Sequence, residues 1–361
     1  MDTLVINSTS SHNNSYQVTI TIDANWKKYW LKKEFNTSFY QALADHIINT
    51  PYVDMKHNFM EVDGVIIYRP NHDVGHSLRQ AVNTQFLLET IAIVGLPEIK
   101  NALQHLTDEE REAVMLAAFL FRAGRTNERG GINDPSNAER SALIFTEIAK
   151  AVEFNVALID NIAFNMCHYV PIIDEELTKS LPYQGYEGDK SIQINKSKLI
   201  KAVLDLSHHS DLVRCWGNIE RINKNNLENL SGLLESDYVE KSHNVLLDFA
   251  RAGNAITGNP YFKHNGTHDK FLPPMLFRKK TVTHVGDIFA DLLKLMNQFL
   301  PYIKLKEVEK SKQSLSDVEQ NINQASKVNS NSDSYLNIRL AFFKEAKEQI
   351  IDSVIKRFNY S

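Results

Sequence analysis

The chain has 361 residues, of which 43% are hydrophobic and 23% are charged, and its formal net charge is −4. These values are typical of a globular protein long enough for one large domain or two smaller ones, and they exclude a fibrous or disordered chain. Lysines and arginines are scattered among acidic residues, so the sequence indicates no basic surface for nucleic acid. We therefore expect no nucleic-acid partner.

The N-terminus and the apolar segments bear on cellular location. Residues 1–7 lack the basic start and the sustained apolar stretch of a signal peptide. No apolar run approaches the roughly 18 residues that a membrane span needs. Both cysteines, Cys167 and Cys215, lie in apolar helical sequence, which favours reduced thiols in a core. We expect no Sec-dependent export, no membrane span and a reducing compartment.

Strands are predicted only near the N-terminus. Residues 16–22 alternate around Val18, Ile20 and Ile22, which is typical of a strand. Residues 59–68 flank an Asp63-Gly64 turn, which predicts a β-hairpin. These strands make up a minor β element near residues 16–68.

The rest of the chain is predicted to be mainly helical. Apolar residues recur at helical spacing from residue 74 to residue 94. Capping boxes at 107–110 and 136–139 each predict the start of a helix, the first of which is apolar on nearly every side and should lie inside a bundle. A further helix is expected over 199–216. Residues 301–361 are expected to form a polar connector and a C-terminal amphipathic helix around residues 340–343.

Two histidines open the first long helix. Pro70 and Asn71 suit a helix entry, and His72 and His76 are four residues apart, so they would share one face. Because a helix N-terminus favours an anion, this arrangement points to phosphate chemistry.

Further candidates come from two later segments. Gly124 is followed by Arg125 and, three residues on, by Glu128, while His208 precedes Asp211 and Arg214. Such side chains can cleave a phosphodiester through a phosphohistidine: one imidazole attacks phosphorus, a carboxylate fixes its tautomer, a second imidazole protonates the leaving oxygen, and guanidiniums bind the phosphate.

Simpler interpretations stand beside this one. Arg125 and Glu128 could equally form a local ion pair in a loop. Glu139 occupies the N3 position of a capping box, which alone accounts for it, so Glu128 is preferred as the carboxylate. His209 should point about 100° away from His208 on a helix, so only His208 is expected in the site.

A metal site is the main chemical alternative. His72, His76, His208 and Asp211 could bind a divalent ion, as in helical metallophosphohydrolases of the HD type. Those enzymes need a His-Asp pair at the end of the central helix, whereas this helix ends with two cations, Arg122 and Arg125. A metal-free mechanism is therefore predicted.

Three motifs in this order resemble the phosphodiesterase domain of the SidE family of bacterial effectors: residues 69–72, residues 124–128, and the segment from Ser207 to Cys215. The resemblance covers roughly residues 52–300. It implies a helical phosphodiesterase domain within residues 1–300, with a smaller helical cap lobe after the β element. It also implies that His72 is the nucleophile, that Glu128 is the carboxylate that supports His72, and that His208 acts as general acid and base. The pocket would be lined by Arg69, Asn71, His76, Arg125 and Arg214, with no cofactor and no metal.

The resemblance also implies a substrate. Members act on ubiquitin modified at an arginine with ADP-ribose or phosphoribose. No Glu-x-Glu motif of an ADP-ribosyltransferase lies in a suitable position, so the chain resembles the stand-alone, Dup-type deubiquitinases, which remove phosphoribosyl-linked ubiquitin from serines. The alternatives are a ligase that uses the same intermediate, an HD-type nucleotide phosphohydrolase, and an inactive module that binds ubiquitin or ADP-ribose. As an effector, the protein would act in the host cell cytoplasm.

Overall fold

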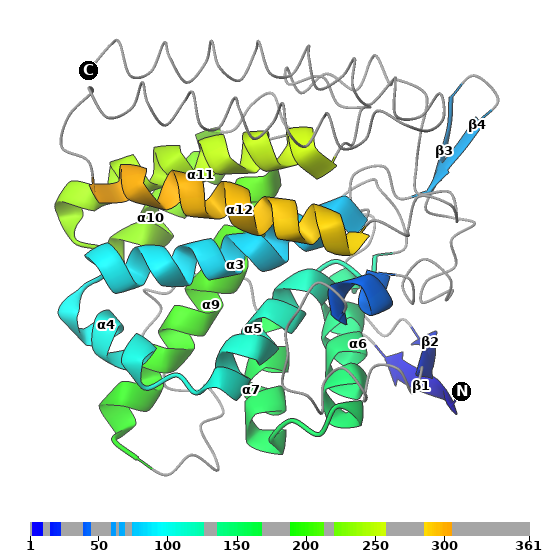
Figure 1. Cartoon of the computed structure of the whole chain (residues 1–361). Coiled ribbons are helices and arrows are strands. Elements are labelled where there is room, and N and C mark those ends of the chain that lie inside the picture. The colour runs from blue at the N-terminus through cyan, green and yellow to red at the C-terminus, as the bar shows by residue number, and fades with distance from the viewer. Residues whose placement is uncertain are drawn as a thin grey trace.

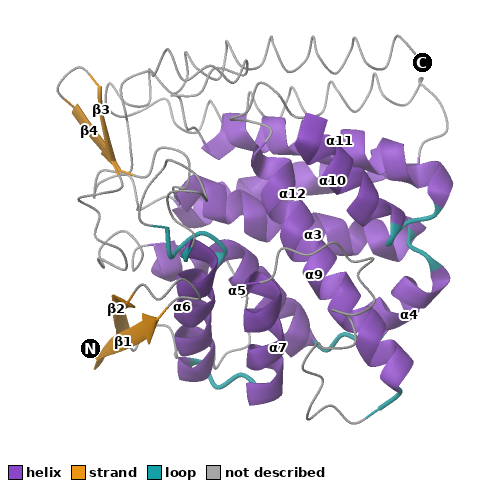
Figure 2. Ribbon diagram, turned by 180° about the vertical axis from the view of Figure 1, so that it is seen from behind, coloured by secondary structure: helices purple, strands orange, loops and turns teal. Residues whose placement is uncertain are grey.

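The computed structural model describes ten ranges of the chain: 2–9, 15–22, 39–44, 59–62, 65–68, 74–125, 136–167, 188–212, 220–257 and 285–304. Within these ranges the fold is mainly α, as predicted, with two small antiparallel hairpins (Figure 2). Residues 39–44 are helical. The other helices are α3 Val74–Val94, α4 Pro97–Gln104, α5 Asp108–Leu120, α6 Asn137–Ala151, α7 Val156–Cys167, α9 Lys190–Leu212, α10 Glu220–Ser231, α11 Ser236–Thr257 and α12 Val285–Lys304.

Both hairpins lie near the N-terminus. Strand β1 Asp2–Thr9 pairs with β2 Ser15–Ile22, and β3 Phe59–Val62 pairs with β4 Val65–Tyr68. The second hairpin and strand β2 are confirmed predictions, whereas β1 was not predicted. Its three β-branched residues, Thr3, Val5 and Ile6, were the available signal.

Helix α3 is the centre of the fold. It contacts α11 and α12 on one side and α5 and α9 on the other (Figure 1). Apolar side chains such as Leu78, Val82 and Phe86 are almost fully buried along it. This is the long amphipathic helix that the sequence predicts, although it begins at Val74, so His72 lies outside the described residues.

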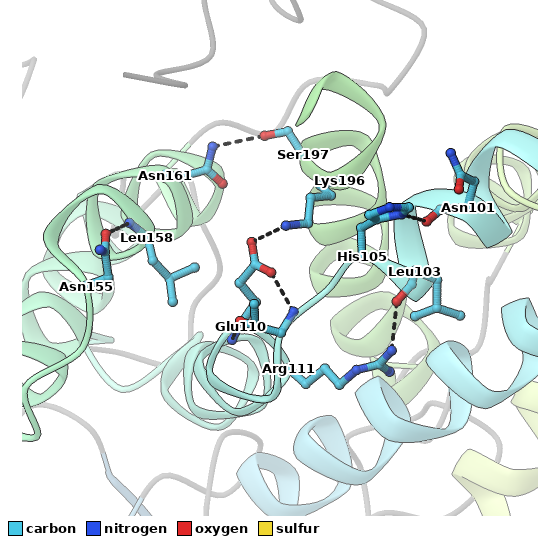
Figure 3. Close-up of polar contacts among 11 residues, drawn as sticks. Asn101, Leu103, His105, Glu110, Arg111, Asn155, Leu158, Asn161, Lys196 and Ser197 are labelled. Carbon is cyan, nitrogen blue, oxygen red and sulfur yellow. Dashed lines mark hydrogen bonds and ion pairs between the residues drawn. The ribbon is translucent and has the colours of Figure 1, made fainter. Parts of the chain in front are cut away.

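Helix α5 is buried as its composition predicts, with its residues from Ala113 to Leu120 at most 8% exposed. Its capping box is confirmed: the Glu110 amide donates to the Thr107 hydroxyl, and the Thr107 amide donates to the Glu110 carboxylate. The other carboxylate oxygen of Glu110 accepts from Nζ of Lys196 on α9 at 2.8 Å (Figure 3). We call Glu110 and Lys196 the Glu110 pair.

The predicted capping box at the start of α6 is wrong. Ser136 has φ −90° and ψ 11° instead of an extended backbone, and its side chain makes no capping hydrogen bond. The first turn of α6 is instead bonded to the end of α5: the Gly124 amide donates to the Ser141 hydroxyl, and Nε of Arg140 donates to the Gly124 carbonyl. These contacts hold the two helix ends together without a cap.

Gly124 is needed at this junction. A Cβ on this residue would stand 2.5 Å from the Ser141 backbone nitrogen and 2.6 Å from Cβ of Arg140. Helix α5 ends at Leu120 and turns through Gly124, where the sequence predicts the end of the helix.

The later helices differ from the sequence predictions mainly in length. Helix α9 begins at Lys190, nine residues before the predicted start, and ends at Leu212. Helix α12 continues past residue 300 to Lys304, and residues 305–361 lie outside the described ranges, as does the loop 126–135. The smaller cap lobe and the C-terminal connector therefore stay predictions. Among the helices within the described ranges, none is long and apolar enough to cross a bilayer.

Candidate active site

The antiparallel packing of α3 and α9 brings two histidines together. His76 lies in the first turn of α3, and His208 lies near the end of α9. Their ring centroids are 5.4 Å apart, with planes at 68°, and both side chains are almost fully buried. Two residues that are 132 positions apart in the chain thus form one site.

Asp211 binds one side of this histidine pair. Its carboxylate accepts a hydrogen bond from Nδ1 of His76 at 2.5 Å. The same carboxylate accepts from Nε of Arg79 at 2.6 Å and from Nη2 of Arg79 at 3.0 Å. All three side chains are at most 1% exposed, so water does not solvate the Asp211 carboxylate. Arg79 neutralises and orients this carboxylate instead.

Arg122 binds the other side of the pair. Its Nε donates to Nε2 of His208 at 3.1 Å, and its Nη1 donates to Oδ1 of Asn137 at 2.8 Å. The guanidinium carbon also lies 4.9 Å from the ring centroid of Phe121. The end of α5 and the start of α6 therefore place a cation directly on the second imidazole. We call His76, Arg79, Arg122, His208 and Asp211 the histidine cluster.

A second acidic group on α9 lies close to this cation. Burial raises the pKa of Asp205, and this effect is opposed first by Lys201 and then by Arg122. Nζ of Lys201 donates to Asp205 at 2.6 Å. Asp205 thus interacts with two cations, Lys201 on its own helix and Arg122 of the histidine cluster.

Three of the predicted site residues fall within the described ranges. His76 and His208 are brought together, and Arg125, 7% exposed, follows the end of α5 only three residues after Arg122. The other predicted residues lie outside the described ranges: Arg69, Asn71, His72, Glu128 and Arg214.

Arg79 and Asn137 were not predicted as site residues, and Arg122 was considered only as a residue that disfavours a metal. Asp211 was considered only as part of the segment after His208 and as a possible metal ligand, whereas its carboxylate binds His76 and Arg79. A signal for Arg79 was present, because it lies three residues after His76 and therefore on the same face of the helix.

The donor set of the histidine cluster fits an anion better than a metal ion. Nε2 of His208 accepts from a guanidinium, and the Asp211 carboxylate is shared by His76 and Arg79. Across the described part of the chain, no three His, Cys, Asp or Glu side chains form a group that could hold a metal. Arginines beside imidazoles are suited to bind a phosphate and to move a proton.

Comparison with known proteins gives the family. A model of the SidE phosphodiesterase (PDE) domain matches residues 40–268, which include the three motifs and the described histidine cluster. No curated protein matches the chain.

Solved structures of one Legionella pneumophila protein are similar to this chain. The C-terminal domain of lpg1496 in complex with nucleotide shares 17% identity, with 76% of this chain and 87% of that chain covered and a TM-score of 0.34. A structure described as uncharacterized protein lpg1496 shares 18% identity, with 76% and 60% covered and a TM-score of 0.32. Because the family model spans more than half of the sequence, this chain belongs to the SidE phosphodiesterase domain family and is a phosphodiesterase.

Proposed function

We propose that this phosphodiesterase removes ubiquitin from serines to which it is linked through phosphoribose. It would cleave the phosphoribosyl-serine bond and release phosphoribosyl-ubiquitin. It would also cleave ADP-ribosyl-ubiquitin to phosphoribosyl-ubiquitin and AMP. Members of this family act on ubiquitin, and the family match across all three sequence motifs is the observation that carries the proposal.

The proposed chemistry has two displacements at phosphorus. His72 attacks the phosphoryl group and forms a phosphohistidine, Glu128 supports the resulting imidazolium, and His208 donates a proton to the departing serine oxygen. Water, activated by His208, then breaks the phosphorus–nitrogen bond. Arg125 and Arg214 would bind the non-bridging oxygens, beside Arg69 and Asn71. The burial of His208 among charged partners supports its proposed role, because it fixes the ring orientation.

A ubiquitin ligase is the nearest alternative. Ligase and hydrolase would share the phosphohistidine intermediate and differ only in whether a serine hydroxyl or water accepts the phosphoribosyl group. The resemblance to the stand-alone members favours the hydrolase.

The mechanism is proposed to need no metal. A divalent ion bound by His208 would need the ring lone pair that accepts from Arg122 at 3.1 Å. Prolonged dialysis against a strong chelator should leave the rate unchanged. A loss of activity that Mn²⁺ or Mg²⁺ restores would support the HD-type phosphohydrolase instead.

The protein is further proposed to be an effector that acts on ubiquitin in the host cell cytoplasm, without a nucleic-acid partner. This location follows from the family resemblance and from the ubiquitin substrate.

The decisive experiment offers the full chain two substrates and reads the products by intact-mass spectrometry. With serine-linked phosphoribosyl-ubiquitin, we expect free phosphoribosyl-ubiquitin and unmodified substrate protein. With ADP-ribosyl-ubiquitin, we expect phosphoribosyl-ubiquitin and AMP. Adding an acceptor protein distinguishes the ligase, because net formation of serine-linked ubiquitin would overturn the deubiquitinase proposal.

The His72→Ala variant is the matched control for both reactions. It removes the nucleophile, so it should bind ADP-ribosyl-ubiquitin without cleaving it or forming an adduct. Cleavage by this variant would mean that His72 is not the nucleophile.

A further inference from the structure

We propose that Asp211 and Arg122 are positioning residues that fix the tautomers of the two neighbouring histidines and give them complementary roles. His76 would carry its proton on Nδ1 and present a basic Nε2. His208 would also carry its proton on Nδ1, but it would present that N–H as a donor. A neutral imidazole in water prefers the proton on Nε2, so both rings would hold the less common tautomer.

The tautomer of His76 is set by its partner, Asp211. An ionised carboxylate can only accept hydrogen bonds, so the 2.5 Å contact with Asp211 places a proton on Nδ1 of His76. Two hydrogen bonds from Arg79 keep this buried carboxylate ionised and prevent its rotation. The other nitrogen of His76 is then the basic one.

The tautomer of His208 is set by a partner of the opposite kind, the cation Arg122. A guanidinium has no lone pair to offer and can only donate, so the 3.1 Å contact from Arg122 requires an unprotonated Nε2 on His208. Asn137 accepts from the same guanidinium, and the ring of Phe121 lies beneath it, so Arg122 is itself held in place. The proton of neutral His208 must then lie on Nδ1.

Together the two contacts assign a proton position to each histidine. The catalytic role inferred from these positions rests on the proposed function. In the hydrolase, Nδ1–H of His208 would donate a hydrogen bond, and then its proton, to the departing serine oxygen, where negative charge develops. The ring anion left at His208 would keep its Nε2 contact with Arg122 and would take a proton back from the attacking water. Arg122 and Asp211 would not touch the substrate in this role. They would act through the orientation and proton position of the two rings.

The first test measures the tautomers directly and needs no substrate. Imidazole ¹⁵N shifts are recorded on the full-length protein labelled at histidine, and the two rings are assigned with His76→Gln and His208→Gln variants. We expect the Nδ1–H pattern for both rings. An Nε2–H pattern for either ring in the wild-type protein would overturn the proposal, whatever the enzyme acts on.

The variants then separate positioning from stability. Arg122→Gln keeps a donor for Nε2 of His208, whereas Arg122→Met removes it. The Met variant should shift His208 toward the Nε2–H tautomer and lower kcat about 10-fold with little change in KM, while the Gln variant should keep the Nδ1–H tautomer and most of the activity. Equal loss in both variants without a tautomer change would contradict a positioning role for Arg122.

Asp211→Asn tests the other ring. The amide cannot accept from both Arg79 and His76 in the native pattern, so His76 should change tautomer and kcat should fall by about 10² or more. Glu110→Gln is the control, because it breaks a buried ion pair between α5 and α9, the helix that carries Asp211, without touching an imidazole. The control should leave both tautomers and kcat unchanged. An equal loss of kcat in both variants would assign the effect of Asp211 to packing.

Discussion

Two buried charge networks join the helices of this fold, and they differ in the partners that the acidic residue of each network binds. In the Glu110 pair, the acid binds Lys196 and a backbone amide of its own helix start (Figure 3). In the histidine cluster, the acid Asp211 binds Arg79 and the ring of His76. Both acids are buried and paired with a cation.

The difference shows that a buried ion pair alone does not identify an active site. Glu110 completes a capping box and a contact between α5 and α9, so stability accounts for all its partners. Asp211 instead restricts a side chain that can exchange protons, 5.4 Å from a second such side chain. Substitutions in the two networks should therefore separate activity from stability.

The largest effect is expected at His208. His208→Gln should lower kcat about 10³-fold on serine-linked ubiquitin, because general acid and base catalysis by one side chain is typically worth 10² to 10⁴. On ADP-ribosyl-ubiquitin the loss should be smaller, since AMP departs with little protonation. Rates with both substrates check this, and equal losses would contradict the role of His208 toward the leaving group.

The Glu110 pair should give the opposite result. Glu110→Gln leaves the ammonium of Lys196 buried without its counter-charge, which should lower the free energy of unfolding by about 3 kcal/mol. Denaturant unfolding measures the loss, and the rate per folded molecule should stay at the wild-type value. A fall in kcat with unchanged stability would mean that the comparison between the two networks is wrong.

Local sequence patterns predicted the helices well but not the contacts between them. The spacing of apolar residues located α3, and Thr107 with Glu110 marked the start of α5. The same Ser/Thr-x-x-Glu pattern failed at Ser136, whose backbone is not extended and whose side chain makes no capping hydrogen bond. The pattern alone does not specify the backbone conformation of its first residue, which decides whether the side chain can reach the first turn.

The histidine cluster could be predicted only in part for the same reason. His76 stood out because it follows His72 by four residues at a helix start, and His208 because Asp211 and Arg214 follow it closely. Their partners could not be assigned, since the choice of Asp211 for His76 depends on how α3 and α9 are aligned. In the sequence, Arg122 was considered only as a residue that disfavours a metal site. Its hydrogen bond to His208 is visible only in the structure.

The acidic partner of His72 gives the next largest effect. Glu128→Gln should lower kcat about 10²-fold with the fold intact, because the amide cannot stabilise an imidazolium. Glu139→Gln should change kcat little. With no capping box at Ser136, it should also avoid the loss of about 1 kcal/mol that a broken cap would cause. Loss of activity in the Glu139 variant alone would reverse the assignment of the carboxylate.

The smallest effect concerns Cys167 and shows where the charge of Glu139 acts. Burial, and then the negative charge of Glu139, raise the pKa of Cys167 from 9.0 to about 11. The folded thiol therefore keeps its proton while an unfolded one loses it, so this contribution to stability is complete below about pH 9 and disappears as the pH rises toward 11. Glu139→Gln should lower the pKa of Cys167 toward 9 without reaching it, because burial remains. Alkylation rates of Cys167 between pH 8 and about 11, resolved by peptide mapping, measure both values. An unchanged pKa of Cys167 in the Glu139 variant would mean that this carboxylate acts on another group, and it would reopen Glu139 as the carboxylate that supports His72.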